Sequence, residues 1–115
     1  MTITLYGIPN CDTVKKARAW LAAQGIDAQF IDFKKGGVAP LRLDAWLASV
    51  GWEVLLNRKG TTWRKLGDAL RGAVVDTASA RQLMLEQPSV IKRPVVEWGA
   101  ADITVGFDAA AWARR

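Results

Sequence analysis

The first 33 residues predict a strand, a helix and a second strand, and this order constrains the fold more than any other part of the sequence. Residues 2–6 form a short apolar run, and residues 28–33 form another. Between them lies a helix that ends at about Gln24, with an apolar face made by Val14, Ala17, Trp20 and Leu21. Strands joined by a helix of this length lie parallel, with a right-handed crossover. We therefore expect a βαβ unit at the start of a single domain spanning residues 1–115.

The middle of the chain is predicted to be mainly helical. Pro40 is well placed in the first turn of one helix. Asp76 or Thr77 can cap another, which stops before Pro88. Between these helices, residues 57–65 predict a basic loop or a pair of short turns.

The end of the chain returns to strands. Residues 94–98 and 103–107 each have the pattern of a short strand, and Asp108 can cap a final helix that contains Trp112. The complete order of elements predicts an α/β fold, in which a mixed sheet carries helices on both faces.

Cys11 lies where the first strand and its turn lead into the first helix, and it is the only cysteine of the chain. The free N–H groups and positive dipole end of a helix stabilise a thiolate, and Lys15 and Lys16 add positive charge. We therefore expect the thiol pKa to lie below the free value of about 8.5. The alternative is that Cys11 is a small buried apolar residue, as many free cysteines are.

The sequence lacks histidine, and its single cysteine cannot form an internal disulfide. These absences exclude the common zinc, copper and haem ligand sets and the imidazole base of cysteine proteases. We therefore expect no metal cofactor and a thiol that is activated by electrostatics. The chain shows neither the pattern of a signal peptide nor a long apolar run, so the expected location is cytoplasmic, away from the membrane.

A net charge of +5 admits nucleic acid, an acidic protein or small anions as partners. The basic residues are spread along the chain in small groups, and no nucleic-acid-binding motif accompanies them. A solvated surface is the simpler interpretation of each group. We therefore do not expect nucleic acid to be a partner.

Three sequence blocks then follow one another along the chain: Gly7-x-x-Asn10-Cys11-Asp12-Thr13, Gly60-Thr61-Thr62-Trp63-Arg64-Lys65 and Ile91-Lys92-Arg93-Pro94-Val95. Together they resemble the arsenate reductase-like (ArsC) family, which also contains Spx and YffB, and the YffB branch is the nearest. The resemblance implies a thioredoxin-like fold with a helical insertion. It also implies a cis peptide bond before Pro94, which would face the cysteine; the alternative is an ordinary trans proline.

The resemblance implies roles for single residues as well. Cys11 matches the nucleophile, Thr13 matches a position whose hydroxyl can bond the thiolate, and Arg93 matches the arginine that faces an anion. Lys15 is expected to hold the thiolate together with the helix end. A surface charge is the alternative interpretation of Arg93. Further candidates for substrate binding are Asn10, Arg58, Arg64 and Pro94.

The chain departs from arsenate reductases at several of these positions. Those enzymes carry Thr-Ser-Arg after the cysteine, where this chain has Thr13-Val14-Lys15. Asn57 stands in the place of an arginine, and a C-terminal arginine is replaced near Phe107. Val14 also occupies the position of the second, resolving cysteine of dithiol redox proteins. A cycle through Cys11 would therefore need an external thiol, most simply glutathione.

The main hypothesis is a thiol–disulfide reductase with glutathione as co-substrate, which is the activity attributed to YffB-like proteins. A second hypothesis is a binding module similar to the Spx regulators, which contact an RNA polymerase subunit. Such regulators commonly carry a Cys-x-x-Cys switch, which Val14 rules out here. A third hypothesis is arsenate reduction coupled to glutathione or glutaredoxin.

Overall fold

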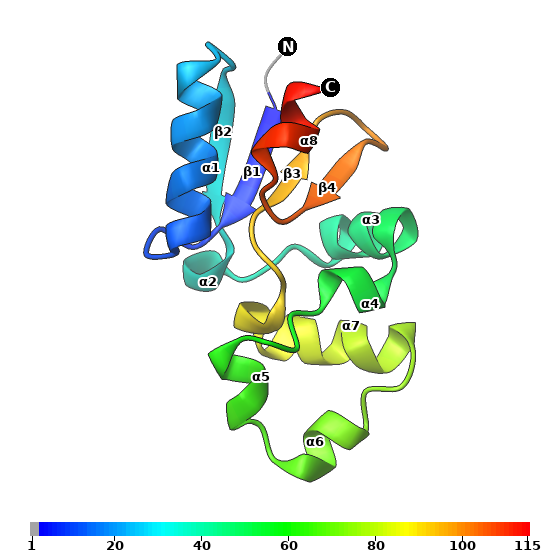
Figure 1. Cartoon of the computed structure of the whole chain (residues 1–115). Helices are drawn as coiled ribbons and strands as arrows, with labels where there is room; N and C mark the ends of the chain where they lie inside the picture. Colours follow the sequence, from blue (N-terminus) through cyan, green and yellow to red (C-terminus); the bar gives the residue numbers. More distant parts are fainter. Residues whose placement is uncertain (1–2) are drawn as a thin grey trace.

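The computed structural model describes residues 3–115, in which four strands form a mixed sheet of order β2-β1-β3-β4 (Figure 1). β1 (Ile3–Gly7) and β2 (Ala28–Asp32) are parallel and are joined by α1 (Asp12–Ala23). β3 (Val95–Glu97) is antiparallel to β1, and β4 (Ile103–Val105) is antiparallel to β3. The predicted βαβ unit and mixed sheet are confirmed. Thr2, predicted as part of the first strand, lies outside the described residues.

Helices cover both faces of the sheet, as the sequence predicts. Successive side chains of a strand point to opposite faces, and in β1 Leu5 packs with α1 and α8 (Ala109–Ala113), whereas Tyr6 packs with α3 (Pro40–Val50). The core on the α1 side contains Ile3, Leu5, Val14, Ala17, Leu21, Val96 and Trp112. The larger core on the other side joins Tyr6, Val95 and Ile103 of the sheet to Trp46, Leu83, Met84 and their neighbours.

The segment between β2 and β3 forms the predicted helical insertion (Figure 1). Besides α3 it contains α2 (Phe33–Gly36), α4 (Trp52–Leu55), α5 (Thr61–Lys65), α6 (Asp68–Gly72), α7 (Thr77–Glu86) and a 3-10 turn, η1 (Pro88–Val90). Asp76 caps α7 as predicted, because its side chain accepts a hydrogen bond of 2.9 Å from the Ser79 N–H. The sequence pattern does not predict α4 or α6, which are too short to show a helical period.

Phe33 corrects one prediction, since it was expected to end the second strand. In the structure it begins α2 and is fully buried. The Asp32 side chain accepts hydrogen bonds from the N–H groups of Lys34 and Lys35, at 3.0 and 3.2 Å, and so turns the chain out of the sheet. A local side-chain cap therefore overrides the strand pattern at this position.

Two backbone hydrogen bonds connect the helical insertion to the residues that lead into β3. Asn57 N–H donates to the Val90 carbonyl, and Lys92 N–H donates to the Leu55 carbonyl, both at 2.8 Å. These bonds flank an antiparallel bridge between Leu56 and Ile91. The residues after α4 are thereby held beside the residues that precede β3.

The helices of this protein are short. The longest, α1, has 12 residues. Within residues 3–115, no helix combines the length and the apolar character that crossing a lipid bilayer would require.

Candidate active site

Cys11 is the N-cap residue of α1, with extended backbone angles of φ −106° and ψ 122°. Its carbonyl accepts the first helical hydrogen bond, from the Lys15 N–H at 2.9 Å, while its side chain makes no capping hydrogen bond to the backbone. The half-buried thiol therefore lies beside N–H groups that the helix itself leaves without partners. This is the position that the sequence predicts for it.

The surroundings of Cys11 favour the thiolate. Partial burial raises the pKa of the Cys11 thiol. The nearby Val14 N–H, the Arg93 side chain with its positive charge, and the Thr13 N–H favour the thiolate and together lower this pKa below its usual value. The expectation of a lowered pKa is thus supported. Lys15, which the sequence predicts to stabilise the thiolate, is not among the causes of the lowered pKa.

Arg93 lies two residues before β3, and the Arg93–Pro94 peptide bond is cis as predicted. Its Nη1 donates hydrogen bonds to the carbonyls of Ser89 and Ile91, at 2.8 and 3.4 Å, so the side chain is held in place by η1 and the residue that follows it. Its Nε is buried and has no hydrogen-bond partner among the described residues. A fixed guanidinium with a spare buried donor is suited to bind an anionic group.

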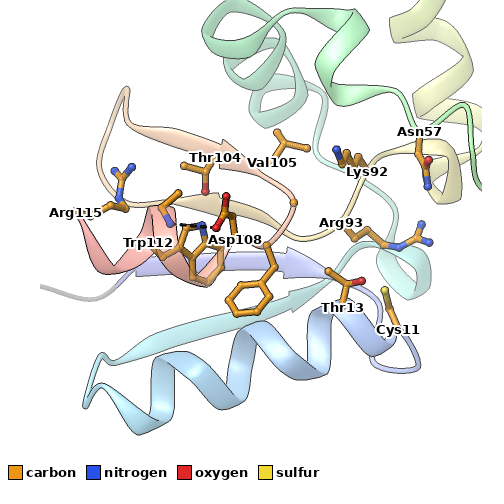
Figure 2. A pocket seen from close by; sticks show the side chains of 13 residues that line it. Cys11, Thr13, Asn57, Lys92, Arg93, Thr104, Val105, Asp108, Trp112 and Arg115 are labelled. Atoms are coloured by element: carbon orange, nitrogen blue, oxygen red, sulfur yellow. Dashed lines mark hydrogen bonds between the residues drawn. The ribbon is translucent and has the colours of Figure 1, made fainter.

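Cys11 and Arg93 line one cleft of about 560 Å³, which Figure 2 shows running from the start of α1 toward the C-terminal helix. This volume lies in the range of small-molecule sites. In the view of Figure 2, the thiol and the Arg93 guanidinium lie at one end, and Trp112 and Arg115 lie at the other. The remaining lining residues are Thr13, Asn57, Lys92, Thr104, Val105, Gly106, Phe107, Asp108 and Ala111.

The far end of the cleft is built on an aromatic cluster. Trp112 makes edge-to-face contacts with Phe107 and Trp98, whose ring centroids lie 4.8 and 5.0 Å away. The Arg115 guanidinium lies 4.5 Å from the centroid of the Trp98 ring and pairs with Asp102. This end of the cleft therefore presents both apolar surface and paired charges.

The structure brings Cys11, Thr13 and Arg93 into this cleft but not the other predicted site residues. Lys15 and Asn10 are exposed, and Arg64 is exposed on α5; none of them lines the cleft. Arg58 does not line the cleft either, and its guanidinium lies 5.1 Å from the centroid of the Trp52 ring. Pro94 is buried and shapes the site through its backbone, since its carbonyl accepts a 2.9 Å hydrogen bond from the Gly106 N–H.

Several lining residues were not predicted as functional. Asn57 and Lys92 come from the two segments that the Leu56–Ile91 bridge joins, and both line the cleft. Lys92 also packs against Gly106, where an added Cβ would lie 3.3 Å from the Lys92 Cε. The sequence did contain a signal for Lys92, because it directly precedes Arg93 in the third sequence block. Asp108 and Arg115 carried no such signal, because only the fold of α8 brings them here.

Comparisons with known proteins agree with this architecture. The ArsC family model matches residues 6–114. A solved structure of a YffB protein is 48% identical, with 97% of this chain and 96% of that chain covered and a TM-score of 0.90. The structure of an arsenate reductase related protein from Brucella melitensis is 54% identical, with 99% and 93% covered and a TM-score of 0.78. An arsenate reductase from Rhizobium meliloti is 31% identical over 84% of this chain and 69% of its own length. The resemblance inferred from the three sequence blocks and the thioredoxin-like fold are confirmed.

Proposed function

Because the chain belongs to the ArsC family, we propose that it is a thiol–disulfide reductase that depends on glutathione and reacts through Cys11. The observation that carries this proposal is the position of Cys11, whose thiol pKa is lowered by Arg93 and by helix N–H groups, in a cleft large enough for a tripeptide. The thiolate is the reactive form in disulfide exchange. At any given pH, Cys11 is therefore ionised to a greater extent than an ordinary cysteine.

The cycle consists of three thiolate–disulfide exchanges. The Cys11 thiolate attacks one sulfur of a substrate disulfide, the S–S bond breaks, and the other substrate sulfur leaves as a thiolate that takes up a proton. A glutathione thiolate attacks the Cys11 sulfur, releases the second substrate thiol and leaves Cys11 bonded to glutathione. A second glutathione attacks the glutathione sulfur of that bond and releases the Cys11 thiolate with oxidised glutathione. Two glutathione thiols thus supply the two electrons that reduce the substrate.

An external thiol is required because the chain has one cysteine. Val14, in the place of a resolving cysteine, is fully buried in the core beneath α1. Its side chain therefore supports the helix rather than the reaction. We place the cycle in the cytoplasm, where glutathione is abundant and reduced.

Arg93 and Lys92 give the Cys11 end of the cleft its positive charge, beside the amide of Asn57. Glutathione carries two carboxylates, and a guanidinium fork with a free Nε donor matches a carboxylate well. Thr13 lines the cleft two residues after the thiol and can donate its hydroxyl hydrogen to the sulfur. Arg93 thus has two roles in the proposal, since it stabilises the thiolate and binds the co-substrate.

The test is turnover of 2-hydroxyethyl disulfide with glutathione, followed through the appearance of oxidised glutathione. Cys11→Ser should abolish turnover, and Arg93→Ala should lower it by about tenfold, the loss expected for one charge-assisted hydrogen bond. Arg71→Ala removes an arginine from the distant helix α6 and should change turnover by less than about twofold. Full activity of Cys11→Ser, or no glutathione oxidation by the wild-type protein, would overturn the proposal.

Arsenate reduction is a second candidate, because the 31% identical relative from Rhizobium meliloti is an arsenate reductase and Arg93 offers a free donor to an oxyanion. Arsenate replaces the disulfide in the same assay, with glutaredoxin added. Arsenite formation that requires Cys11 would favour this candidate. Its absence, alongside disulfide turnover, would favour the reductase.

A further inference from the structure

A second cavity, of about 350 Å³, adjoins the active-site cleft. Asn57 and Lys92 line both cavities and form the wall between them. We call the second cavity the basic pocket; its other polar and apolar lining residues include Glu53, Val54, Arg58 and Lys59. A ligand group in this pocket would therefore lie next to a molecule reacting at Cys11.

The backbone holds the basic residues of this pocket in a defined turn. The Asn57 side-chain carbonyl accepts a 3.1 Å hydrogen bond from the Lys59 N–H, and the Asn57 N–H is bonded to Val90. Gly60 closes the turn so tightly that an added Cβ would lie 2.8 Å from the Asn57 Nδ2. The Arg58 guanidinium is supported by its stacking on the Trp52 ring. The pocket is therefore already shaped before a ligand arrives.

The charge of the basic pocket is not neutralised within the protein. Arg58, Lys59 and Lys92 line it, and in the described part of the chain none of these three cations forms a salt bridge. Glu53 is the one carboxylate among the lining residues. The pocket thus presents an excess of positive charge, which attracts anionic groups and speeds their approach.

The lining also includes exposed apolar surface. The Val54 side chain is 52% exposed beside these cations. A small inorganic anion would leave this surface unused, whereas a polypeptide carries acidic and aliphatic side chains along one extended backbone. A polypeptide is also long enough to reach past the Asn57–Lys92 wall while its own disulfide lies at Cys11.

We propose that the basic pocket docks acidic side chains of a protein substrate whose disulfide is reduced at Cys11. The inference rests on the proposed reductase function and names its substrate class, an acidic polypeptide disulfide. Its chemistry adds no step to the cycle: the substrate S–S bond breaks, Cys11 forms a disulfide with one sulfur, and the other leaves as a thiolate.

The experiment compares two synthetic peptides, each with one cysteine joined to glutathione by a disulfide. In one peptide glutamates and a leucine flank the cysteine, and in the other glutamines replace the glutamates. Single-turnover rates with the wild-type protein should be about fivefold higher for the acidic peptide at low ionic strength, and this ratio should fall as salt is added. Arg58→Ala/Lys59→Ala should bring the ratio close to one, and Lys59→Glu should favour the neutral peptide.

The matched control is Lys34→Ala/Lys35→Ala, which removes two exposed cations from α2 that line neither cavity. It should keep the wild-type ratio. Equal rates for the two peptides with the wild-type protein, or a ratio that survives Arg58→Ala/Lys59→Ala, would overturn the docking proposal alone. If neither peptide nor 2-hydroxyethyl disulfide is reduced, the reductase function itself fails and the docking proposal fails with it.

Discussion

Gly7, the last residue of β1, packs so closely against Val14 in the first turn of α1 that an added Cβ would lie 2.8 Å from the Val14 Cγ2. Real Cβ atoms essentially never approach a neighbour this closely. The contact sets how near the start of α1 lies to the end of β1. Cys11 lies between the two residues in the chain, so the same contact fixes the position of the thiol.

Gly7→Ala should therefore destabilise the protein by about 1–3 kcal/mol, the usual cost of overpacking a close-packed site. Thermal unfolding followed by circular dichroism measures the effect. Gly72→Ala is the control, because nothing lies within 4 Å of a Cβ at that helix position. That variant should be neutral or slightly more stable. A Gly7→Ala protein that unfolds at the wild-type temperature would contradict the close contact.

Tyr6, the only tyrosine, should deprotonate at unusually high pH. The pKa of Tyr6 is raised to about 12 by burial, by a hydrogen bond of 3.0 Å from its hydroxyl to Glu97, and by the negative charge of Glu97. The positive charge of Arg42 lowers this pKa and so acts in the opposite direction. Tyrosinate absorbance measures the midpoint. Glu97→Gln should lower it, and Arg42→Ala should raise it. A wild-type midpoint at the ordinary value would contradict the burial of this hydroxyl.

The same shift makes stability depend on alkaline pH. Because the folded pKa lies above the unfolded value of about 10, the contribution of Tyr6 to stability is fully present below pH 10 and is lost as the pH rises to about 12. Denaturant unfolding across this range measures the loss. In Glu97→Gln the loss should be smaller and should end at lower pH, since that variant lowers the folded pKa.

Local patterns were enough to predict most of the fold. The apolar spacing of α1, the caps at Asp76 and Asp108, and the turn before Cys11 each depend on residues close in sequence. Asp76 and Asp108 accept hydrogen bonds from N–H groups three residues later. Such signals lie within one turn of chain, so the sequence alone predicts them. Phe33 was placed wrongly because the cap at Asp32 competes with a strand pattern of similar strength.

The candidate site was only partly predictable, since its residues come together through long-range contacts. Cys11 and Arg93 were found through the sequence blocks that carry them. Asn57 reaches the cleft through the Leu56–Ile91 bridge, and Arg115 reaches it through α8; no local pattern reports either contact. Lys15 was predicted to hold the thiolate because it lies close to Cys11 in sequence. On the helix its side chain is exposed and lines no part of the cleft.

The pH profile of Cys11 alkylation tests the electrostatics of the site. The rate with iodoacetamide should rise with pH and level off at a midpoint below the free thiol value of about 8.5. Arg93→Ala should move the midpoint up, because it removes both a hydrogen bond and a positive charge from the thiolate. Arg71→Ala should leave the profile in place. Identical midpoints in the wild-type protein and Arg93→Ala would show that Arg93 does not stabilise the sulfur.

The free energy of unfolding should also depend on the ionisation of Cys11. Because the folded pKa of Cys11 is lowered, the thiolate stabilises the folded state above the unfolded pKa of about 8.5, and this contribution is lost as the pH falls through the folded pKa. Cys11→Ser should remove this pH dependence. Denaturant unfolding of both proteins from neutral to mildly alkaline pH measures the difference.

Lys15 and Arg93 are both predicted from the sequence as residues of the Cys11 site, but the structure places them differently. The sequence places both cations near Cys11, but only Arg93 lines the cleft and lowers the pKa of the thiol. At neutral pH, Arg93→Ala should slow alkylation by about tenfold, whereas Lys15→Ala should slow it by less than about twofold, as expected for a solvent-screened charge. Lys16→Ala, on the next residue of the same helix turn, is the matched control and should behave as Lys15→Ala does. If Lys15→Ala slows the reaction as much as Arg93→Ala, the lysine reaches the thiolate in solution and stabilises it, as the sequence predicts.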